Sequence, residues 1–357
     1  MKIAVNTGGG DAPGLNAVIR GVVLAAYRKG WQVFGIKYGY QGLIDTKQIV
    51  RLTPESVWDI TNLGGTILGS AVKGNPFKYT RQGPNGSMIE EDISDIVVSN
   101  FKLLGFDALI AIGGDGSLAI ANKFCKKGIP VIGIPKTIDN DINATDVTFG
   151  FDTAVNIATE AIDKLHTTAR SHDRVMVVEV MGRYTGWIAL YSGISGSADV
   201  ILIPEIPFDI QKVCMKIKQL ELIGQHYAIV VVAEGAKPLG GDITIAERGV
   251  EGVRLGGISK KVADEIEKRT GKETRSIILG HLQRGGAPTT FDRLLCLRFG
   301  TEAIRLVETG KFGSMVALHS TKICDVPIED AIGQMKTVPS ESDIVHTAKA
   351  LGISFGD

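Results

Sequence analysis

Short apolar segments rich in β-branched residues recur along the chain, and glycine, proline or polar residues bound each of them. Segments that are apolar throughout are typical of strands covered on both faces, as in parallel sheets. We therefore expect strands at residues 2–6, 31–36, 107–112, 130–134, 175–180, 200–205 and 227–233.

Between these segments the apolar residues follow a helical period, which predicts helices at residues 16–30, 152–169, 211–224 and 259–271. Because strand and helix alternate, the sequence indicates an α/β fold with mainly parallel sheets. We expect two closely packed α/β layers that are interleaved in sequence. The glycine- and proline-rich residues 235–257 are expected to form a long surface loop.

Length and charge limit the function classes. A chain of 357 residues is long enough for about two domains. Its 39 basic and 39 acidic residues balance, which gives no sign of a nucleic-acid or membrane partner, so any phosphate binding must be local. The four cysteines are widely spaced without a CxxC pair, as in proteins with reduced thiols. With no leader-like start and no apolar run near ~18 residues, we expect a soluble cytoplasmic protein.

Two glycine-rich loops follow predicted strands. Residues 7–16 read TGGGDAPGLN, where consecutive glycines could direct free N–H groups at an anion, although neither GxGxxG nor GxxxxGK[ST] is matched. Residues 111–117 read AIGGDGS, and Asp115 at the mouth of a parallel sheet is a natural partner for Mg²⁺. A tight turn with a solvated aspartate is the alternative interpretation.

A third loop, IPKTIDND at residues 134–141, places Lys136, Asp139 and Asp141 after another strand. Asn–Asp clusters after a strand often only make turns. Three such loops at the carboxyl ends of strands are nevertheless hard to explain as coincidence. Together they indicate phosphoryl transfer assisted by a metal ion.

The second half of the chain supplies cations for an anionic substrate. Arginine recognises phosphate through a planar fork, although an isolated surface arginine is usually only solvated. Glu234 ends an apolar segment, where it could accept hydrogen bonds from sugar hydroxyls. The candidate cations are Arg174, Arg183, Arg275, His281 and Arg284.

These segments resemble the 6-phosphofructokinase family, in which TGGGDAPGLNAVIRG, GGDGS, TIDND, MGRYTGW and LGHLQRGG have counterparts in the same order. The resemblance extends from Lys2 to about Lys336. It implies phosphoryl transfer to the C1 hydroxyl of fructose 6-phosphate, which gives fructose 1,6-bisphosphate in glycolysis. It also implies two similar three-layer α/β domains with the active site in the cleft between them. A homotetramer or homodimer that shares the substrate site between subunits is the expected assembly.

The same resemblance predicts the domain bounds and the donor site. Residues 1–150 and about 283–335 would bind the donor, and residues 151–282 and about 336–357 would bind the sugar phosphate. Asp139 resembles the general base, Thr137 and Lys136 lie beside the transferred phosphoryl, and Arg183 would neutralise transition-state charge. Donor contacts are expected from Gly10, Lys73, Gly114, Asp115, Gly116 and Ser117, with Asp115 holding Mg²⁺.

The sugar-phosphate site is likewise carried over by position. Its expected contacts are Thr137, Ile138, Asp139, Arg174, Met181, Gly182, Arg183, Glu234, Arg275, His281, Gln283 and Arg284. Arg275, His281 and Arg284 would form the 6-phosphate pocket, which Arg174 would enter from a neighbouring subunit.

One donor position departs from the family pattern. After GGTILGSA, relatives commonly carry an arginine that meets the donor's phosphates, whereas this chain has Val72 followed by Lys73. We expect Lys73 to replace that arginine after a shift of one residue. Lysine supplies the charge but not the fork geometry.

Two positions bear on the phosphoryl donor and point in opposite directions. ATP users in the family resemble one another in having a glycine after GGD and another before TIDND. Pyrophosphate users have an acidic residue at the first of these positions and a lysine at the second. Gly116 resembles the ATP users and Lys136 the pyrophosphate users. A carboxylate at position 116 would repel the α-phosphate of ATP, while Lys136 excludes neither donor. We therefore favour ATP, with pyrophosphate as the alternative.

Functions of other classes match parts of the pattern. A non-catalytic nucleotide sensor would lack the base, the metal carboxylate or the sugar-phosphate arginines, all of which are present. A nicotinamide-dependent oxidoreductase would need GxGxxG, whereas residues 8–14 read GGGDAPG. NAD kinase also uses a GGDG loop, but GHLQRGG and MGRYTGW favour a sugar phosphate as the acceptor.

Overall fold

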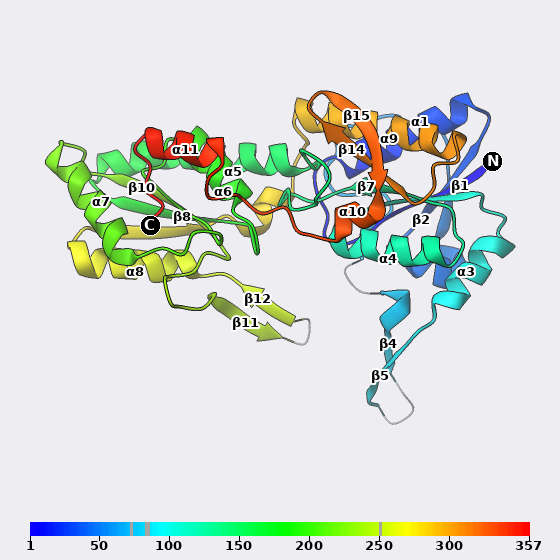
Figure 1. Ribbon diagram of the computed structural model, residues 1–357, viewed down its shortest axis with the longest axis horizontal. Coiled ribbons are helices and arrows are strands. Elements are labelled where there is room, and N and C mark those ends of the chain that lie inside the picture. Colours follow the sequence, from blue (N-terminus) through cyan, green and yellow to red (C-terminus); the bar gives the residue numbers. More distant parts are fainter. Residues whose placement is uncertain (72–73, 83–85, 250–251) are drawn as a thin grey trace. The chain divides into compact units, whose positions relative to one another are not determined.

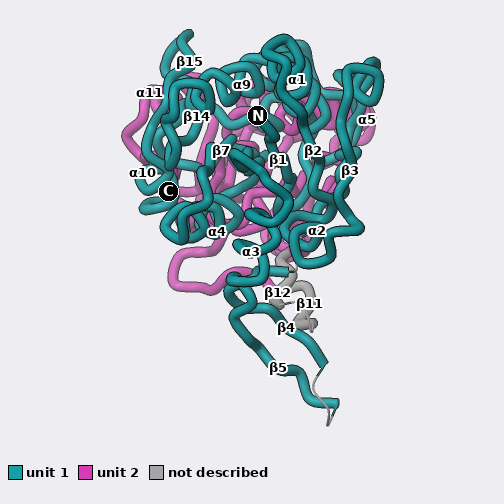
Figure 2. The backbone as a smooth tube through the Cα atoms, turned by 90° about the vertical axis from the view of Figure 1, so that its right-hand side faces the viewer, with its two compact units in different colours: residues 1–152, 284–335 teal, residues 153–283, 336–357 magenta. Residues whose placement is uncertain are grey.

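The computed structural model describes residues 1–71, 74–82, 86–249 and 252–357. The chain divides into two compact units, which Figure 2 distinguishes by colour. Unit 1 comprises residues 1–152 and 284–335, and unit 2 comprises residues 153–283 and 336–357. These bounds lie within about two residues of the expected domain bounds. The binding role assigned to each domain remains a prediction.

Unit 1 is built on a seven-stranded sheet with the order β15-β14-β7-β6-β1-β2-β3 (Figure 1). Its strands are β1 (Lys2–Thr7), β2 (Gln32–Ile36), β3 (Ile49–Leu52), β6 (Ala108–Gly113), β7 (Val131–Pro135), β14 (Ser314–His319) and β15 (Lys322–Pro327). The strands from β14 to β2 run parallel, and the two edge strands pair antiparallel with their neighbours. The carboxyl ends of β1, β6 and β7 therefore meet at one edge.

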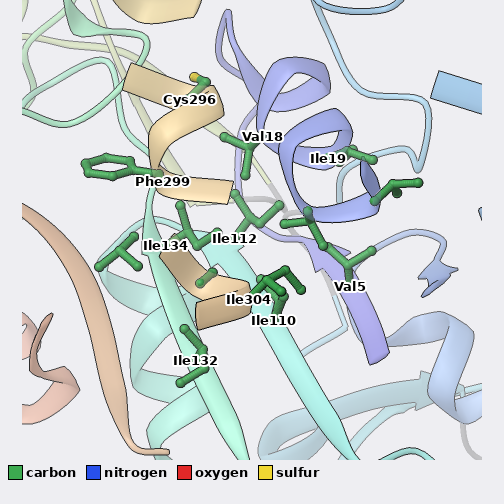
Figure 3. Packing of buried hydrophobic residues seen from close by; sticks show 14 of the residues in the cluster. Val5, Val18, Ile19, Ile110, Ile112, Ile132, Ile134, Cys296, Phe299 and Ile304 are labelled. Carbon is green, nitrogen blue, oxygen red and sulfur yellow. The ribbon is translucent and has the colours of Figure 1, made fainter. Parts of the chain in front are cut away.

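Helices cover both faces of this sheet because the central strands are apolar on both faces. One layer contains α1 (Leu15–Arg28) and α9 (Thr290–Glu308), and the other contains α3 (Ser94–Leu103) and α4 (Asp115–Lys126) (Figure 1). In the first layer, Val18 and Phe299 belong to one buried cluster with Ile112 and Ile134 of the sheet (Figure 3). The two helices approach so closely that a Cβ at Gly300 would lie 2.6 Å from the carbonyl oxygen of Val18.

Unit 2 contains a four-stranded sheet, ordered β13-β8-β10-β9, in which every pair is parallel. Its strands are β8 (Val175–Val180), β9 (Val200–Leu202), β10 (Ala228–Ala233) and β13 (Thr274–Ile278). One face is covered by α7 (Ile210–Leu222) and α8 (Ile258–Thr270). The opposite face is covered by α5 (Phe151–Ser171), α6 (Trp187–Ser195) and α11 (Asp343–Ala350) (Figure 1).

The expected strands and helices are present with small shifts at their ends, and the α/β class with mainly parallel sheets is confirmed. The remaining elements are short: α2 (Gln41–Ile44), α10 (Ile328–Ile332), β4 (Tyr79–Gln82), β5 (Met88–Glu91), β11 (Ile245–Gly249) and β12 (Gly252–Leu255). None of the described helices is long and apolar enough to cross a bilayer. All four cysteines are free thiols.

The prediction of a long surface loop at residues 235–257 was wrong in part. This stretch contains an antiparallel pair, β11 and β12. A two-stranded ribbon has no fully covered face, so its strands IAERG and GVRL carry no continuous apolar run from which strands are usually recognised.

Candidate functional site

A pocket of about 440 Å³ lies in unit 1 where the loops after β1, β6 and β7 converge. Of the residues expected to bind the donor, Gly10, Gly114, Gly116 and Ser117 line it. Ala71 and Gly74 also line the pocket. Lys73 lies between them but outside the described residues, so its expected contact stays a prediction.

The glycines of the first two loops allow close packing at the base of this pocket. A Cβ at Gly8 would lie 2.6 Å from Oγ of Ser117, and a Cβ at Gly113 would lie 2.3 Å from Cβ of the same serine. The backbone of Gly8 also donates to the carbonyl of Ile112 at 2.9 Å. The loop after β1 therefore lies directly on the first turn of α4.

The first turn of α4 brings Gly116 and Ser117 to the pocket, whereas Asp115, the first residue of this helix, is not among the residues that line it. The free N–H groups and positive dipole end of a helix attract anions such as phosphate. A Cβ at Gly116 would meet no atom within 4 Å, so the space beside this residue is open. The geometry agrees with the expectation that position 116 leaves room for a donor.

Lys136 is buried at the side of the pocket, with 4% of its surface exposed. Its Nζ donates to the carbonyl oxygen of Gly10 at 2.5 Å, which joins the loops after β7 and β1. Burial, and next the guanidinium of Arg284, lower the pKa of Lys136 to about 8, against the opposing charges of nearby aspartates. A bound anion would favour the protonated amine.

Asp139 follows Lys136 in a loop that its neighbours hold in place. The Asp139 N–H donates to Oγ1 of Thr137 at 3.1 Å, and Thr148 N–H donates to the side-chain oxygen of Asn140 at 3.0 Å. Burial, and next the charge of Asp141, raise the pKa of Asp139 to about 6. A carboxylate with this pKa is ionised at neutral pH yet basic enough to accept a proton during catalysis.

Asp115 and Asp141 are close enough to interact. Desolvation, and next the charge of Asp141, raise the pKa of Asp115. Among the described residues, no group of three or more His, Cys, Asp or Glu side chains could hold a metal ion by itself. The two carboxylates of Asp115 and Asp141 fit Mg²⁺, which proteins commonly hold through one or two carboxylates while phosphate and water supply the other ligands.

Several residues expected to bind the sugar phosphate lie at the carboxyl edge of the sheet in unit 2. Met181, Gly182 and Arg183 follow β8, and Glu234 follows β10. The backbone N–H of Glu234 donates to Val180 at 2.9 Å, so the two segments are adjacent. His281 follows β13 and is exposed.

Within one chain, Arg275 does not lie with His281 as the expected 6-phosphate pocket would require. Arg275 pairs in register with Met176 near the amino end of β8, whereas His281 follows the carboxyl end of β13. Arg275 is three residues from the end of β13 at Ile278, which is about 10 Å at 3.3 Å per residue, and His281 lies beyond that end. Arg275 lies instead beside Arg174, because both guanidiniums pair with Glu273, that of Arg174 at 2.7 Å.

Two expected contact residues have fully buried side chains. Ile138 belongs to the core, so only its backbone could meet a substrate. Gln283 donates to Gly280 at 3.1 Å and accepts from the backbone N–H of Met181 at 3.3 Å. The prediction that Gln283 contacts the substrate is therefore revised: its side chain supports the Met181 segment.

Arg284 lies beside the first glycine loop of unit 1. It lines the 440 Å³ pocket and donates to the carbonyl oxygen of Asp11 at 3.1 Å. Tyr40, which the sequence analysis missed, also lines this pocket, and burial raises the pKa of its hydroxyl. The available signal was its position just after β2, the strand next to β1.

Comparison with known proteins supports one family. A family model described as phosphofructokinase matches residues 2–307. ATP-dependent 6-phosphofructokinase 2 of Clostridium perfringens is 52% identical, covering 100% of this chain and 98% of its own length. Pyrophosphate–fructose 6-phosphate 1-phosphotransferase of Streptomyces coelicolor is 49% identical, covering 95% of this chain and 96% of its own length.

A solved structure agrees with these matches. The T-state structure of Pichia pastoris phosphofructokinase superposes with a TM-score of 0.81 at 32% identity. The match covers 98% of this chain and 36% of the much longer yeast chain. The chain described here belongs to the phosphofructokinase family.

Proposed function

We propose that this protein is an ATP-dependent 6-phosphofructokinase, which transfers the γ-phosphoryl group of ATP to the C1 hydroxyl of fructose 6-phosphate. The observation that carries this proposal is the pocket of unit 1, where the α4 N-terminus, the open space at Gly116 and the amine of Lys136 converge. Such a pocket suits a chain of phosphates. These metabolites favour a cytoplasmic location.

The residues of this chain supply the parts that phosphoryl transfer needs, namely positioning, a base and positive charge. Asp139 accepts the proton of the C1 hydroxyl as that oxygen attacks the γ-phosphorus, and the bond from this phosphorus to the β,γ-bridging oxygen breaks to release ADP. Lys136 and Arg183 neutralise charge on the transferred group, which grows in the transition state. Glu234 accepts hydrogen bonds from the sugar hydroxyls, and His281 and Arg284 bind its 6-phosphate.

Mg²⁺ would be held by Asp115, with Asp141 near its bound water. When bound, it would supply positive charge that offsets the negative charge of the donor's phosphates. The proximity of Asp141, whose charge raises the pKa of Asp115, supports this assignment.

Arg174 and Arg275 support a shared substrate site. Glu273 holds both at the amino edge of the unit 2 sheet, whereas Met181–Arg183, Glu234 and His281 follow the carboxyl ends of its strands. Within one chain these two groups lie at opposite edges. We propose that Arg174 and Arg275 reach the 6-phosphate of a neighbouring copy, in a homodimer or homotetramer.

The donor is tested by comparing rates with Mg·ATP and Mg·pyrophosphate at saturating fructose 6-phosphate. We expect the ATP rate to exceed the pyrophosphate rate, because nothing occupies the space beside Gly116. Overall identity does not separate the donors, since relatives named for each are about equally similar. A pyrophosphate rate well above the ATP rate would contradict the proposed donor.

The pKa values of Asp139 and Lys136 predict a bell-shaped pH profile of kcat/KM for ATP. Activity should fall as pH drops through about 6, because Asp139 becomes protonated and cannot accept a proton. It should also fall as pH rises through about 8, because Lys136 loses its charge. Steady-state rates at saturating fructose 6-phosphate, measured from below pH 6 to above pH 8, check both limbs.

Asp141→Asn is the control for the acidic limb. It removes a charge that raises the pKa of Asp139, so the limb should move to lower pH. A limb that stays in place would show that another group controls it.

A further inference from the structure

We propose that Glu205 is a positioning residue for Arg183: its carboxylate fastens the end of the loop that carries Arg183. The same carboxylate joins this loop to residues 336–338, the re-entry segment, with which the chain returns from unit 1 to unit 2. The inference rests on the proposed role of Arg183 in phosphoryl transfer.

Glu205 lies in a tight turn that follows β9. The N–H of Ile206 donates to the carbonyl of Ile203 at 3.3 Å, which closes the turn. Because β8 and β9 are both parallel to β10, their carboxyl ends lie at the same edge of the sheet. This places Glu205 on the same side as the Met181–Gly186 loop.

The carboxylate accepts from two backbone segments. The N–H of Gly186 lies 3.0 Å from each oxygen, and the N–H of Val338 donates to Oε1 at 2.9 Å. Burial raises the pKa of Glu205, while these N–H groups favour its ionised form. Removing a buried acceptor with such partners lowers the stability of the folded protein, because the N–H groups are left without an acceptor.

The loop lies directly on the turn that contains Glu205. A Cβ at Gly186 would be 2.3 Å from the side chain of Ile203 and 3.0 Å from a carboxylate oxygen of Glu205. Gly186 is also the N-cap of α6. The bond from Gly186 to Glu205 therefore determines where the Arg183 loop ends and where α6 begins.

The beginning of the loop is held separately. The N–H of Gly235 donates to the carbonyl of Gly182 at 3.1 Å, and a Cβ at Gly235 would lie 2.0 Å from the carbonyl oxygen of Arg183. Arg183 is thus held between a contact with Gly235 and the bond from Gly186 to Glu205. Loss of Glu205 removes the second of these restraints.

The re-entry segment reinforces the second restraint. The indole N–H of Trp187 donates to the carbonyl of Lys336 at 2.9 Å, two residues before Val338. Residues 336–338 therefore lie along the end of the Arg183 loop, and Glu205 holds both at once.

The test compares Glu205→Ala, Glu205→Gln and Asp199→Ala in the full-length protein. Asp199 is a matched control because burial also raises its pKa and it accepts from Gln225 at 3.0 Å and Ile229 at 2.9 Å. Asp199 precedes β9, at the opposite edge of the sheet. The readouts are kcat, the KM for ATP, Tm and hydrogen exchange of the Gly186 and Val338 amides.

We expect Glu205→Ala to lower kcat by about 10–100-fold with little change in the KM for ATP, since small displacements of a catalytic group have effects of this size. Both amides should exchange faster. Glu205→Gln should restore most activity, because its amide oxygen can accept both bonds made to Oε1. Asp199→Ala should lower Tm without a comparable loss of kcat.

Unchanged kcat in Glu205→Ala, or an equal loss in Asp199→Ala, would overturn the inference. Unchanged exchange at Gly186 would overturn it as well, whatever reaction the protein catalyses. Absence of phosphofructokinase activity in the unmodified protein would instead contradict the proposed function, while the exchange measurement would still report on the Glu205 restraint.

Discussion

Asp139→Asn is expected to lower kcat by about 10²–10⁴, because asparagine cannot accept the proton of the attacking hydroxyl. Both substrates should still bind, since asparagine has the size of aspartate and retains a polar side chain. The measurement is the steady-state rate with ATP and fructose 6-phosphate, together with the affinity for each substrate.

Thermal unfolding provides the control for this variant. The pKa of Asp139 is raised to about 6 in the folded protein, so above that pH its ionised form opposes folding. Asparagine removes this penalty, and Tm should stay the same or rise. A folded variant with near-normal turnover would exclude Asp139 as the base.

Gly116→Asp is expected to reduce ATP-dependent activity by at least about 10²-fold, because an unfavourable like charge in a site costs several kcal/mol and each 1.4 kcal/mol is a factor of ten. Any activity with pyrophosphate should be affected much less, since pyrophosphate has no group that corresponds to the α-phosphate with its nucleoside. The fold should persist: a Cβ at this position meets no atom within 4 Å, and an acidic residue suits the first turn of a helix.

Gly116→Asn separates charge from size. It fills nearly the same space without the negative charge, so it should retain more ATP-dependent activity than Gly116→Asp. Equal losses in both variants would mean that size alone excludes ATP. Retained ATP turnover in Gly116→Asp would refute the argument that position 116 selects the donor.

The convergence of the three loops could be predicted from sequence because each loop is a local feature. Gly8–Gly10, the Asp115–Ser117 turn and the Lys136–Asp139 loop each follow an apolar strand directly, and parallel strands carry such loops to one edge. The pocket of unit 1 brings residues from all three together, and the family match supports the same reading of the chain.

Arg275 shows why the position of some expected site residues could not be seen in the sequence. Its strand, β13, lies at the edge of the sheet and reads TRSII, with too few apolar residues to be recognised. Without that strand, sequence could not show that Arg275 and His281 lie at opposite ends of it. The β11–β12 hairpin was missed for a similar reason, because strands that are not covered on both faces lack the apolar signal.

By itself, the sequence determined the α/β class, the order of the main elements and the chemistry available in each loop, because these depend on periodicity and on neighbouring residues. Only the tertiary structure decided which side chains are buried and which edge each occupies. In the structure, Ile138 belongs to the core and Gln283 is a buried supporting residue, although both were expected to contact the substrate. The structure also shows that the carboxylate of Glu205 accepts a hydrogen bond from Gly186. Such pairings join residues distant in sequence, and they depend on the packing of whole strands and helices, which no local pattern records.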